Sequence, residues 1–351
     1  MNHAATGLPF AFGGPVGAGR LRVEPEDFQV RELPVCEPEG AGEHAWLWVR
    51  KRNANTEWVA RQLARHAGVT PREVSFAGLK DRHAVTEQWF SVHLPGQPDP
   101  DWAGARIEGV EILHTARHGR KLKRGALRGN AFVIRIRALS GARAEIDARL
   151  AEIALRGMPN YFGEQRFGHA GGNLEAARAM LDGRTRPPRH LRGLYLSALR
   201  SFLFNQVLAA RVADGSWERA LPGEVLQLDG RRAWFPADPA DAELVPRLTA
   251  LAIHPTGPLW GRGTLATQAD ARHCETETLA PFANLCAGLE RAGLEQDRRA
   301  LRVAVRDLHG DWTPDGDLHI RFTLPAGSYA TALLREIICA EAGADEDEEG
   351  T

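Results

Sequence analysis

Apolar and polar residues alternate in several short segments of this chain of 351 residues, the pattern of half-buried β-strands. Aromatic and β-branched side chains are frequent in these segments, and both kinds favour strands. A Pro-Asp-Gly turn at residues 314–316 separates the last two of them. The pattern predicts strands at residues 20–23, 28–32, 45–49, 89–94, 303–306 and 318–322.

Other segments repeat apolar residues every three to four positions, which predicts amphipathic helices. The first should begin near Asn55 or Thr56, either of which can cap it, and end at Gly68. A second is predicted around residues 146–154 and stops at Gly157, and a largely apolar one covers about residues 194–212. A short helix should begin at Ser328, with the next residue in its first turn.

Strands at both ends of the chain, with helices between them, predict an α+β fold of two domains. We expect residues 1–157 and the returning residues 302–340 to form one domain. Residues 158–301 should form an inserted α/β module, and residues 341–351 an acidic, disordered tail.

Charge changes this picture only moderately. The formal net charge of −1 includes six acids in residues 341–351, so the remaining chain has 44 basic and 39 acidic residues, a net of +5. A mildly basic body is compatible with an RNA partner. The four cysteines form no CxxC pair, and the glycine-rich stretches match no nucleotide-binding pattern, so neither a metal nor a cofactor is predicted. No signal peptide or membrane span is predicted, which favours a cytoplasmic protein.

A cluster of basic residues precedes a longer predicted strand. Within that strand, Phe132, Ile134 and Ile136 share one face, and Arg135 and Arg137 share the other. Such a cluster is more often a solvated loop than a binding site. Its position before a strand that carries an aromatic residue nevertheless suits phosphate binding and base stacking. The cluster has six members and contains no acid: Arg117, Arg120, Lys121, Lys123, Arg124 and Arg128. A second basic run covers residues 184–192.

Three consecutive charges, Lys80, Asp81 and Arg82, lie in a turn between two apolar segments. Charged turn residues usually only face water. A carboxylate between two cations, however, is favoured in its ionised form, which suits a nucleophile better than a general acid.

Five segments of the chain resemble the signature motifs of the TruD family of tRNA pseudouridine synthases. They occur in the family's order and extend over nearly the whole chain, which makes the resemblance highly specific. The resemblance implies the mixed or antiparallel sheet of the pseudouridine synthases, with the middle of the chain as an insertion. The segments are EPEDFQVRE (24–32), FAGLKDRHAVTEQWFSV (76–92), KLKRGALRGNAFVIRIR (121–137), GMPNYFGEQRFG (157–168) and LPAGSYATALLREI (324–337).

The resemblance also implies roles for individual residues. Asp81 occupies the position of the family's catalytic nucleophile. Asn130 would contact the substrate, Phe132 would stack on the target uracil, and Phe28 would line the base pocket. Tyr329 occupies a position where the family more often has phenylalanine, and its hydroxyl needs a hydrogen-bond partner if it is buried.

The implied reaction converts uridine, at position 13 of certain tRNAs, into pseudouridine after the base has been flipped out. It needs tRNA as partner but no cofactor, metal or membrane, and a monomer is expected. A basic side chain should hold the carboxylate of Asp81, and the sequence does not choose between Arg22 and Lys80.

Two other classes of function stay open. A non-catalytic tRNA-binding or folding chaperone could use the same basic and aromatic surface. A carboxylate-dependent hydrolase would need a second acid, which the motifs do not supply.

Overall fold

The computed structural model describes residues 7–341, so the predicted acidic tail lies outside the described residues except for Glu341. The described chain has an α+β fold and forms two compact units. The sheet unit contains residues 17–150, 306–327 and 339–341, and the helical unit contains residues 7–16, 151–305 and 328–338. None of the helices in the described residues is long and apolar enough to cross a membrane.

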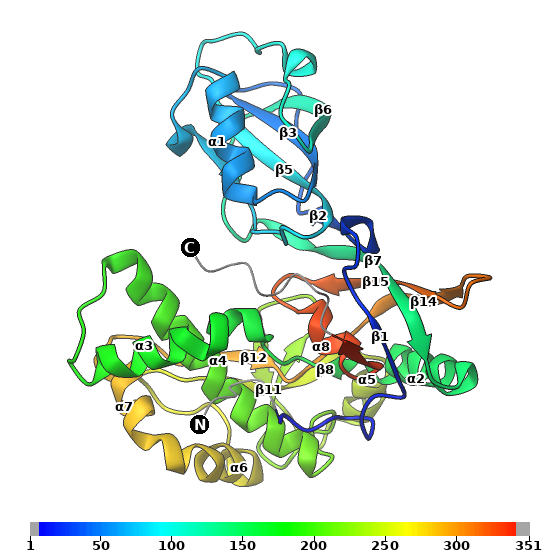
Figure 1. Ribbon diagram of the computed structural model, residues 1–351. Helices are drawn as coiled ribbons and strands as arrows, with labels where there is room; N and C mark the ends of the chain where they lie inside the picture. The colour runs from blue at the N-terminus through cyan, green and yellow to red at the C-terminus, as the bar shows by residue number, and fades with distance from the viewer. Residues whose placement is uncertain (1–6, 342–351) are drawn as a thin grey trace. The chain divides into compact units, whose positions relative to one another are not determined.

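The sheet unit is built on a large sheet that takes strands from both ends of the chain (Figure 1). Neighbouring strands are antiparallel except for β2 and β5, which are parallel. The prediction that strands from both chain ends share one sheet is therefore confirmed. The order is β14 (Arg306–Trp312), β15 (Leu318–Pro325), β7 (Leu127–Ser140), β2 (Phe28–Pro34), β5 (Val85–His93), β3 (His44–Arg52) and β6 (Val110–His118). The short strands β1 (Gly17–Arg20), β4 (Val74–Phe76) and β16 (Ile338–Glu341) pair beside this path.

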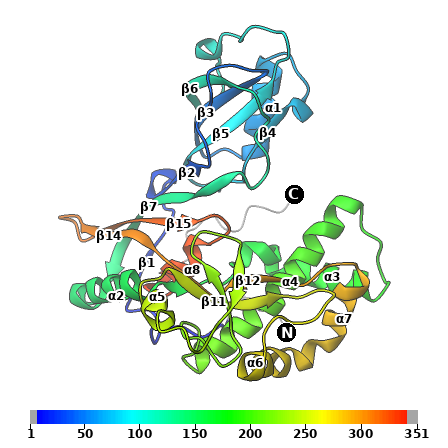
Figure 2. The ribbon, with the colours of Figure 1, turned by 180° about the vertical axis from the view of Figure 1, so that it is seen from behind.

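Helix α1 (Thr56–His66) covers one face of this sheet, close to β4 and β5 (Figure 2). Its N-cap is Asn55, whose side chain accepts a hydrogen bond from the Glu57 amide at 2.9 Å. Gly68 follows the helix with a φ of +66°, which glycine adopts without strain. Val59 and Leu63 are fully buried against the strands, as their spacing predicts. This packing fixes the helix start, which holds the neighbouring loop between β4 and β5.

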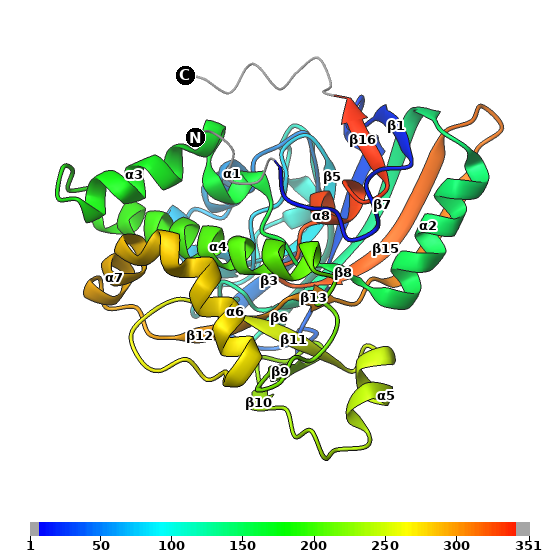
Figure 3. The ribbon, with the colours of Figure 1, turned by 90° about the horizontal axis from the view of Figure 1, so that it is seen from below.

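The helical unit is centred on α4 (Arg189–Ala213), which packs on β11 (Ile253–Leu259) and on three helices. Figure 3 shows α3 (Gly172–Leu181), α6 (Ala269–Leu279) and α7 (Ala283–Arg291) around it. The small sheet follows the order β10 (Trp234–Pro236), β9 (Val225–Leu228), β11 and β12 (Asp297–Ala300). The remaining elements are α5 (Leu244–Thr249), α8 (Ala330–Leu334) and the paired strands β8 (Met158–Pro159) and β13 (Arg302–Val303). Helix α2 (Arg143–Arg156) connects the two units along the chain.

Three local predictions were wrong. The predicted strand at residues 303–306 is divided, because Val303 ends β13 and Arg306 begins β14 in a different sheet. The strand at residues 20–23 ends at Arg20, because Arg22 has a left-handed φ of +56°. Tyr329 is the extended N-cap of α8 and does not lie in its first turn. Arg22 contacts Asp81 and Tyr329 contacts Phe162, and local periodicity does not encode such contacts.

Candidate active site

Asp81 lies in the loop between β4 and β5, and its side chain is about a quarter exposed. Its Oδ2 is 3.2 Å from Nη2 of Arg22. Lys80 has a different partner, because its Nζ donates to Oε2 of Glu32 at 2.9 Å and both side chains are almost completely buried. The structure therefore gives Asp81 an arginine partner from the segment before β2, although the two residues are distant in sequence.

Three buried side chains hold the Asp81 loop in place. Thr56, at the first turn of α1, accepts a hydrogen bond from the Lys80 amide at 3.1 Å. Gln88 donates to the Gly78 carbonyl at 3.1 Å. Lys51 donates from Nζ to the main-chain carbonyl of Asp81 at 2.7 Å. A loop bound at three points presents its central carboxylate in a fixed direction, which a reactive group requires.

Lys51 has a perturbed protonation equilibrium. Burial lowers its pKa to about 8, the nearby Asp81 carboxylate opposes that change, and Lys80 reinforces it. Lys51 was not identified from the sequence as a site residue, although a signal was present. Ala45, Leu47 and Val49 form the buried face of β3, and Lys51 follows in the same phase. A charged side chain in the apolar phase of a strand indicates a buried polar function.

Glu32 was not identified from the sequence either, although the same signal was present. It continues the buried face formed by Phe28 and Val30 in β2, and its side chain is 1% exposed. Its carboxylate accepts hydrogen bonds from Lys80 and, at 3.4 Å, from the amide of Trp89. Glu32 thus joins β2 to the Asp81 loop through Lys80 and to β5 through the Trp89 amide.

Aromatic side chains lie beside the ion pair of Arg22 and Asp81. The Arg22 guanidinium lies 4.3 Å from the ring centroid of Phe28, whose centroid is 6.2 Å from that of Phe132. Phe132 is stacked on Phe322, with centroids 4.9 Å apart and an angle of 17° between the rings. Phe322 was not identified from the sequence as a site residue, although it continues the buried alternation of β15. One face of the Phe132 ring is therefore already covered.

Asn130 lies on β7 between Glu32 of β2 and Leu324 of β15. Its side-chain Oδ1 is buried, and within the described residues it has no hydrogen-bond partner. A buried acceptor without a donor costs about 1–3 kcal/mol of stability. Such an atom is available to a ligand that brings an N–H group.

Tyr329 belongs to the helical unit. Its ring centroid is 6.1 Å from that of Phe162, and the ring packs over Gly163. A Cβ at Gly163 would lie only 3.0 Å from the Tyr329 ring, so the glycine makes this packing possible. The neighbouring Ser328 donates from Oγ to Oδ1 of Asn160 at 3.3 Å.

The basic cluster forms a loop that is attached to the Asp81 loop. The Gly125 amide donates to the Ala77 carbonyl at 2.7 Å, and the Leu122 side chain is buried with Ala77 and Trp89. The exposed members are Arg120, Lys121, Lys123, Arg124 and Arg128.

Other members of the cluster have structural contacts. Arg117 is mostly buried, forms an ion pair with Asp99, and donates to three main-chain carbonyls. The Arg124 guanidinium lies 3.8 Å from the ring centroid of Phe76, and Arg128 donates to the Pro34 carbonyl at 2.8 Å. Among the described residues, the Arg120 and Lys123 side chains form no hydrogen bond or ion pair, and Lys121 donates only to the Arg72 carbonyl, at 3.3 Å.

Comparison with known proteins identifies the family. The family described as tRNA pseudouridine synthase D (TruD) matches residues 10–187 and 174–337. The chain is 51% identical to tRNA pseudouridine synthase D of Methylococcus capsulatus over 332 residues, which is 94% of each protein. It is 49% identical to the protein of that name from Nitrosococcus oceani over 335 residues, 93% of each.

A solved structure supports the fold. The crystal structure of a Methanosarcina mazei protein assigned to tRNA pseudouridine synthase D covers 94% of this chain and 95% of its own, with a TM-score of 0.73 and 20% identity. Because the identity is low, this likeness concerns the fold alone. The match to the family and the identity to its bacterial members extend over nearly the whole chain, and the chain therefore belongs to the TruD family of tRNA pseudouridine synthases.

Proposed function

We propose that this protein isomerises uridine in tRNA to pseudouridine and that Asp81 is its nucleophile. The observation that carries the proposal is the partly exposed carboxylate of Asp81, bound to Arg22 beside Phe28 and Phe132. Membership of the family supports the reaction and a uridine at position 13 as its target. The tRNA substrate in turn supports a cytoplasmic location, and the protein would act as a monomer.

The reaction requires little beyond a fixed carboxylate and a base pocket. The bond between uracil N1 and ribose C1′ breaks, a bond from C5 to C1′ forms, and a proton moves overall from C5 to N1. Nothing is oxidised and no group is imported. Asp81 would act by attack at C1′, by addition to the ring or by removal of the 2′ proton, and in each case as a carboxylate. Arg22 sets the direction of that carboxylate by binding its Oδ2.

The flipped base would lie against the aromatic cluster. Flipping costs a few kcal/mol of stacking and pairing, which contact with Phe28 and Phe132 would offset. Since Phe322 covers one face of Phe132, the uracil would use the remaining face or the edge. The unpartnered Oδ1 of Asn130 would accept a hydrogen bond from uracil N3–H, which would satisfy this buried atom.

The phosphates near the target uridine would bind the exposed basic loop. Its attachment to Ala77 supports this assignment, because the loop is held next to the Asp81 loop. Arg117, which the sequence analysis grouped with these residues, is assigned a structural role here because of its bond to Asp99. In this proposal the sheet unit is the catalytic domain and the helical unit contains the inserted module.

The proposal is tested by Asp81→Asn, which keeps the side-chain shape but removes the charge. We expect pseudouridine formation to become undetectable while tRNA affinity changes less than about threefold, because the chemical step is lost and binding is retained. The assay is chemical labelling of pseudouridine in tRNA, since pseudouridine has the mass of uridine. Asp315→Asn, the same change in an exposed turn of the sheet unit, is the matched control and should keep full activity.

Substantial turnover by a folded Asp81→Asn protein would contradict the nucleophile assignment. The alternative, a non-catalytic tRNA chaperone, requires that the wild-type protein form no pseudouridine and that Asp81→Asn leave tRNA folding unchanged. Circular dichroism on the same preparation separates lost chemistry from lost folding.

A further inference from the structure

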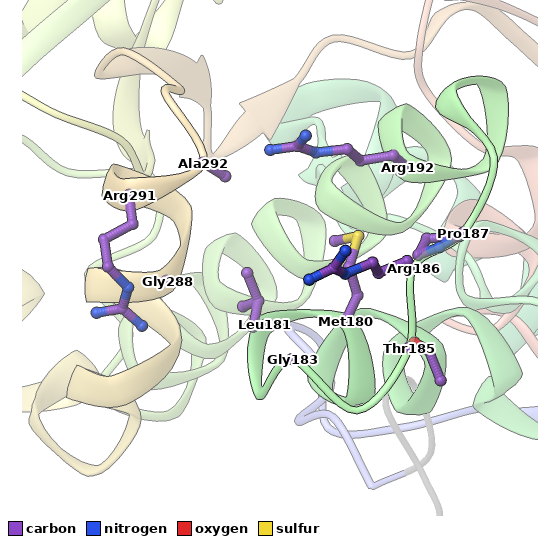
Figure 4. A pocket seen from close by; sticks show the side chains of 10 residues that line it. All are labelled: Met180, Leu181, Gly183, Thr185, Arg186, Pro187, Arg192, Gly288, Arg291 and Ala292. Carbon is purple, nitrogen blue, oxygen red and sulfur yellow. The ribbon is translucent and has the colours of Figure 1, made fainter.

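The helical unit contains a hollow between α7 and the segment that joins α3 to α4 (Figure 4). Its volume is about 460 Å³, and it is open to solvent. Its walls include Leu181, Arg186, Arg192, Gly288 and Arg291.

Only positively charged side chains contribute formal charge to the lining of the hollow. Three arginines and no acid are among the residues that line it. All three arginines are exposed, and none forms an ion pair within the residues that the structure describes. Figure 4 shows the guanidinium groups of Arg186 and Arg192 directed into the space in front of α7. Three uncompensated cations around one hollow repel one another, and an anion between them would remove that repulsion.

A neighbouring arginine differs from those that line the hollow. Arg184 is only two residues from Arg186, but it forms an ion pair with Asp182 at 2.9 Å and does not line the hollow. The run at residues 184–192 thus contains one neutralised arginine, Arg184, and two that line the hollow, Arg186 and Arg192.

The start of α4 adds to the positive potential. This helix of 25 residues begins at Arg189, has no side-chain N-cap hydrogen bond and has no acid in its first turn. Helix N-termini are positive, so an arginine such as Arg192 in the first turn opposes helix stability. The basic residues at this end are therefore better explained by an external anion than by the needs of the helix.

The walls of the hollow are well defined. Gly288 of α7 packs directly on Leu181 of α3, and a Cβ at position 288 would collide with that leucine. Close packing at this point fixes the distance between α7 and α3. The apolar atoms of Leu181 and Met180 provide a surface against which the carbon atoms of a sugar can pack.

We propose that this hollow binds the sugar–phosphate backbone of the RNA substrate, an inference that rests on the proposed function. Guanidinium groups match phosphate oxygens through paired hydrogen bonds. The three groups come from the segment between α3 and α4, from α4 and from α7, and they surround an open space that is larger than one phosphate. This arrangement suits a ligand with successive phosphates and an apolar sugar between them, as in an RNA strand.

The test compares two triple variants of the full-length protein. In the hollow variant, Arg186, Arg192 and Arg291 are changed to glutamine. In the control variant, the same change is made at Arg184, Arg247 and Arg262, which belong to the same unit and form ion pairs with Asp182, Asp241 and Glu295. Both variants lose three positive charges, so a difference between them reports the position of the charges and not their number.

For the hollow variant we expect KM for tRNA to rise roughly tenfold or more, with kcat at saturating tRNA changed less than twofold. The slope of log Kd against log salt should decrease by about 0.7–0.9 for each phosphate contact that is lost. The control variant should keep the wild-type KM and slope. Thermal unfolding of both variants should resemble that of the wild type, since all six side chains are exposed or only partly buried.

Equal KM values and salt slopes for the two triple variants would overturn the inference. So would a hollow variant that loses affinity for inorganic pyrophosphate but binds tRNA normally, because the ligand would then be a free phosphate compound. Failure of the proposed function looks different, since the wild-type protein would then form no pseudouridine in the same assay.

Discussion

Lys51 places an ammonium group in the interior of the sheet unit, where it holds the main-chain carbonyl of Asp81. Its pKa of about 8 compares with about 10.4 in an unfolded chain. Below pH 8 the folded protein therefore contains a buried charge that lowers its stability. Between pH 8 and about 10.4 the folded Lys51 becomes neutral while the unfolded one stays charged, so this cost disappears as pH rises.

We expect Lys51→Met to be more stable than the wild type at pH 7, by up to roughly 3 kcal/mol, because methionine fills a similar volume without a charge. The gain should be smaller at pH 9.5, and kcat for pseudouridine formation should fall at both pH values because the Asp81 carbonyl loses its donor. Urea unfolding at the two pH values measures the first effect. A stability difference independent of pH would show that the charge of Lys51 is not the source of the cost.

Single residues also show the limits of sequence reasoning at the candidate site. Asp81, Asn130 and Phe132 were named through the resemblance, and their roles remain predictions. The choice between Arg22 and Lys80 could not be made, because it depends on the left-handed backbone at Arg22 and on the partner Glu32. The first is a local backbone conformation and the second is a tertiary contact, and the pattern around Lys80 shows neither.

Among the elements of the fold, the basic loop between β6 and β7 is packed against the sheet unit and is not a flexible connection. Leu122 anchors it in a cluster with Trp46 and Trp89, and the Leu122 amide donates to Oγ of Ser91 at 3.1 Å. Its exposed lysines therefore have restricted positions, which lowers the entropic cost of binding a phosphate.

We expect the double variant Lys121→Gln and Lys123→Gln to weaken tRNA binding and to reduce the salt slope by about 0.7–0.9 per lost phosphate contact. The control is Arg61→Gln with Arg65→Gln, which removes two exposed charges from α1 of the same unit. Fluorescence anisotropy at several salt concentrations measures both slopes. If the lysine variant and the control have the same slope, the loop is only a solvated surface.

Elements with a strong local pattern were predicted well. Helix α1 has the predicted cap and end, and β7 buries Phe132, Ile134 and Ile136 on one face as its alternation requires. The prediction failed where a segment passes from one sheet to another. Ala304 and Val305 are buried and apolar like strand residues, but they connect β13 to β14. Hydrophobic alternation shows that a residue is buried and does not show which sheet receives it.

At the scale of the whole molecule, the sheet unit is completed by the far end of the chain. Strand β15 pairs with β7 over eight residues, and its side chains Leu318, Ile320, Phe322 and Leu324 are at most 2% exposed. The order of the sequence motifs allowed this return to be predicted. The sequence did not predict that residues 7–16 belong to the helical unit. They join it through tertiary contacts such as the hydrogen bond from Arg335 to the Pro9 carbonyl.

We expect a chain truncated after Val305 to lose the folded sheet unit. Four buried side chains of β15 contribute roughly 1.5–3 kcal/mol each, a sum comparable to the total stability of a domain. Near-ultraviolet circular dichroism should show the loss of fixed tryptophan environments. A truncation after Glu341, which removes only the acidic tail, is the control and should fold like the full chain. A native spectrum for the shorter chain would refute the requirement for β14 and β15.

The left-handed backbone at Arg22 has a consequence for protein engineering. Asparagine adopts this conformation more readily than arginine, so Arg22→Asn would relieve strain while it removed the partner of Asp81. A library sorted for heat resistance would tend to enrich such a change, whereas a library sorted for modified tRNA would discard it. Selection for thermal stability and selection for catalytic activity thus favour different residues at position 22. Arg22 should therefore be left unchanged when this enzyme is engineered for stability.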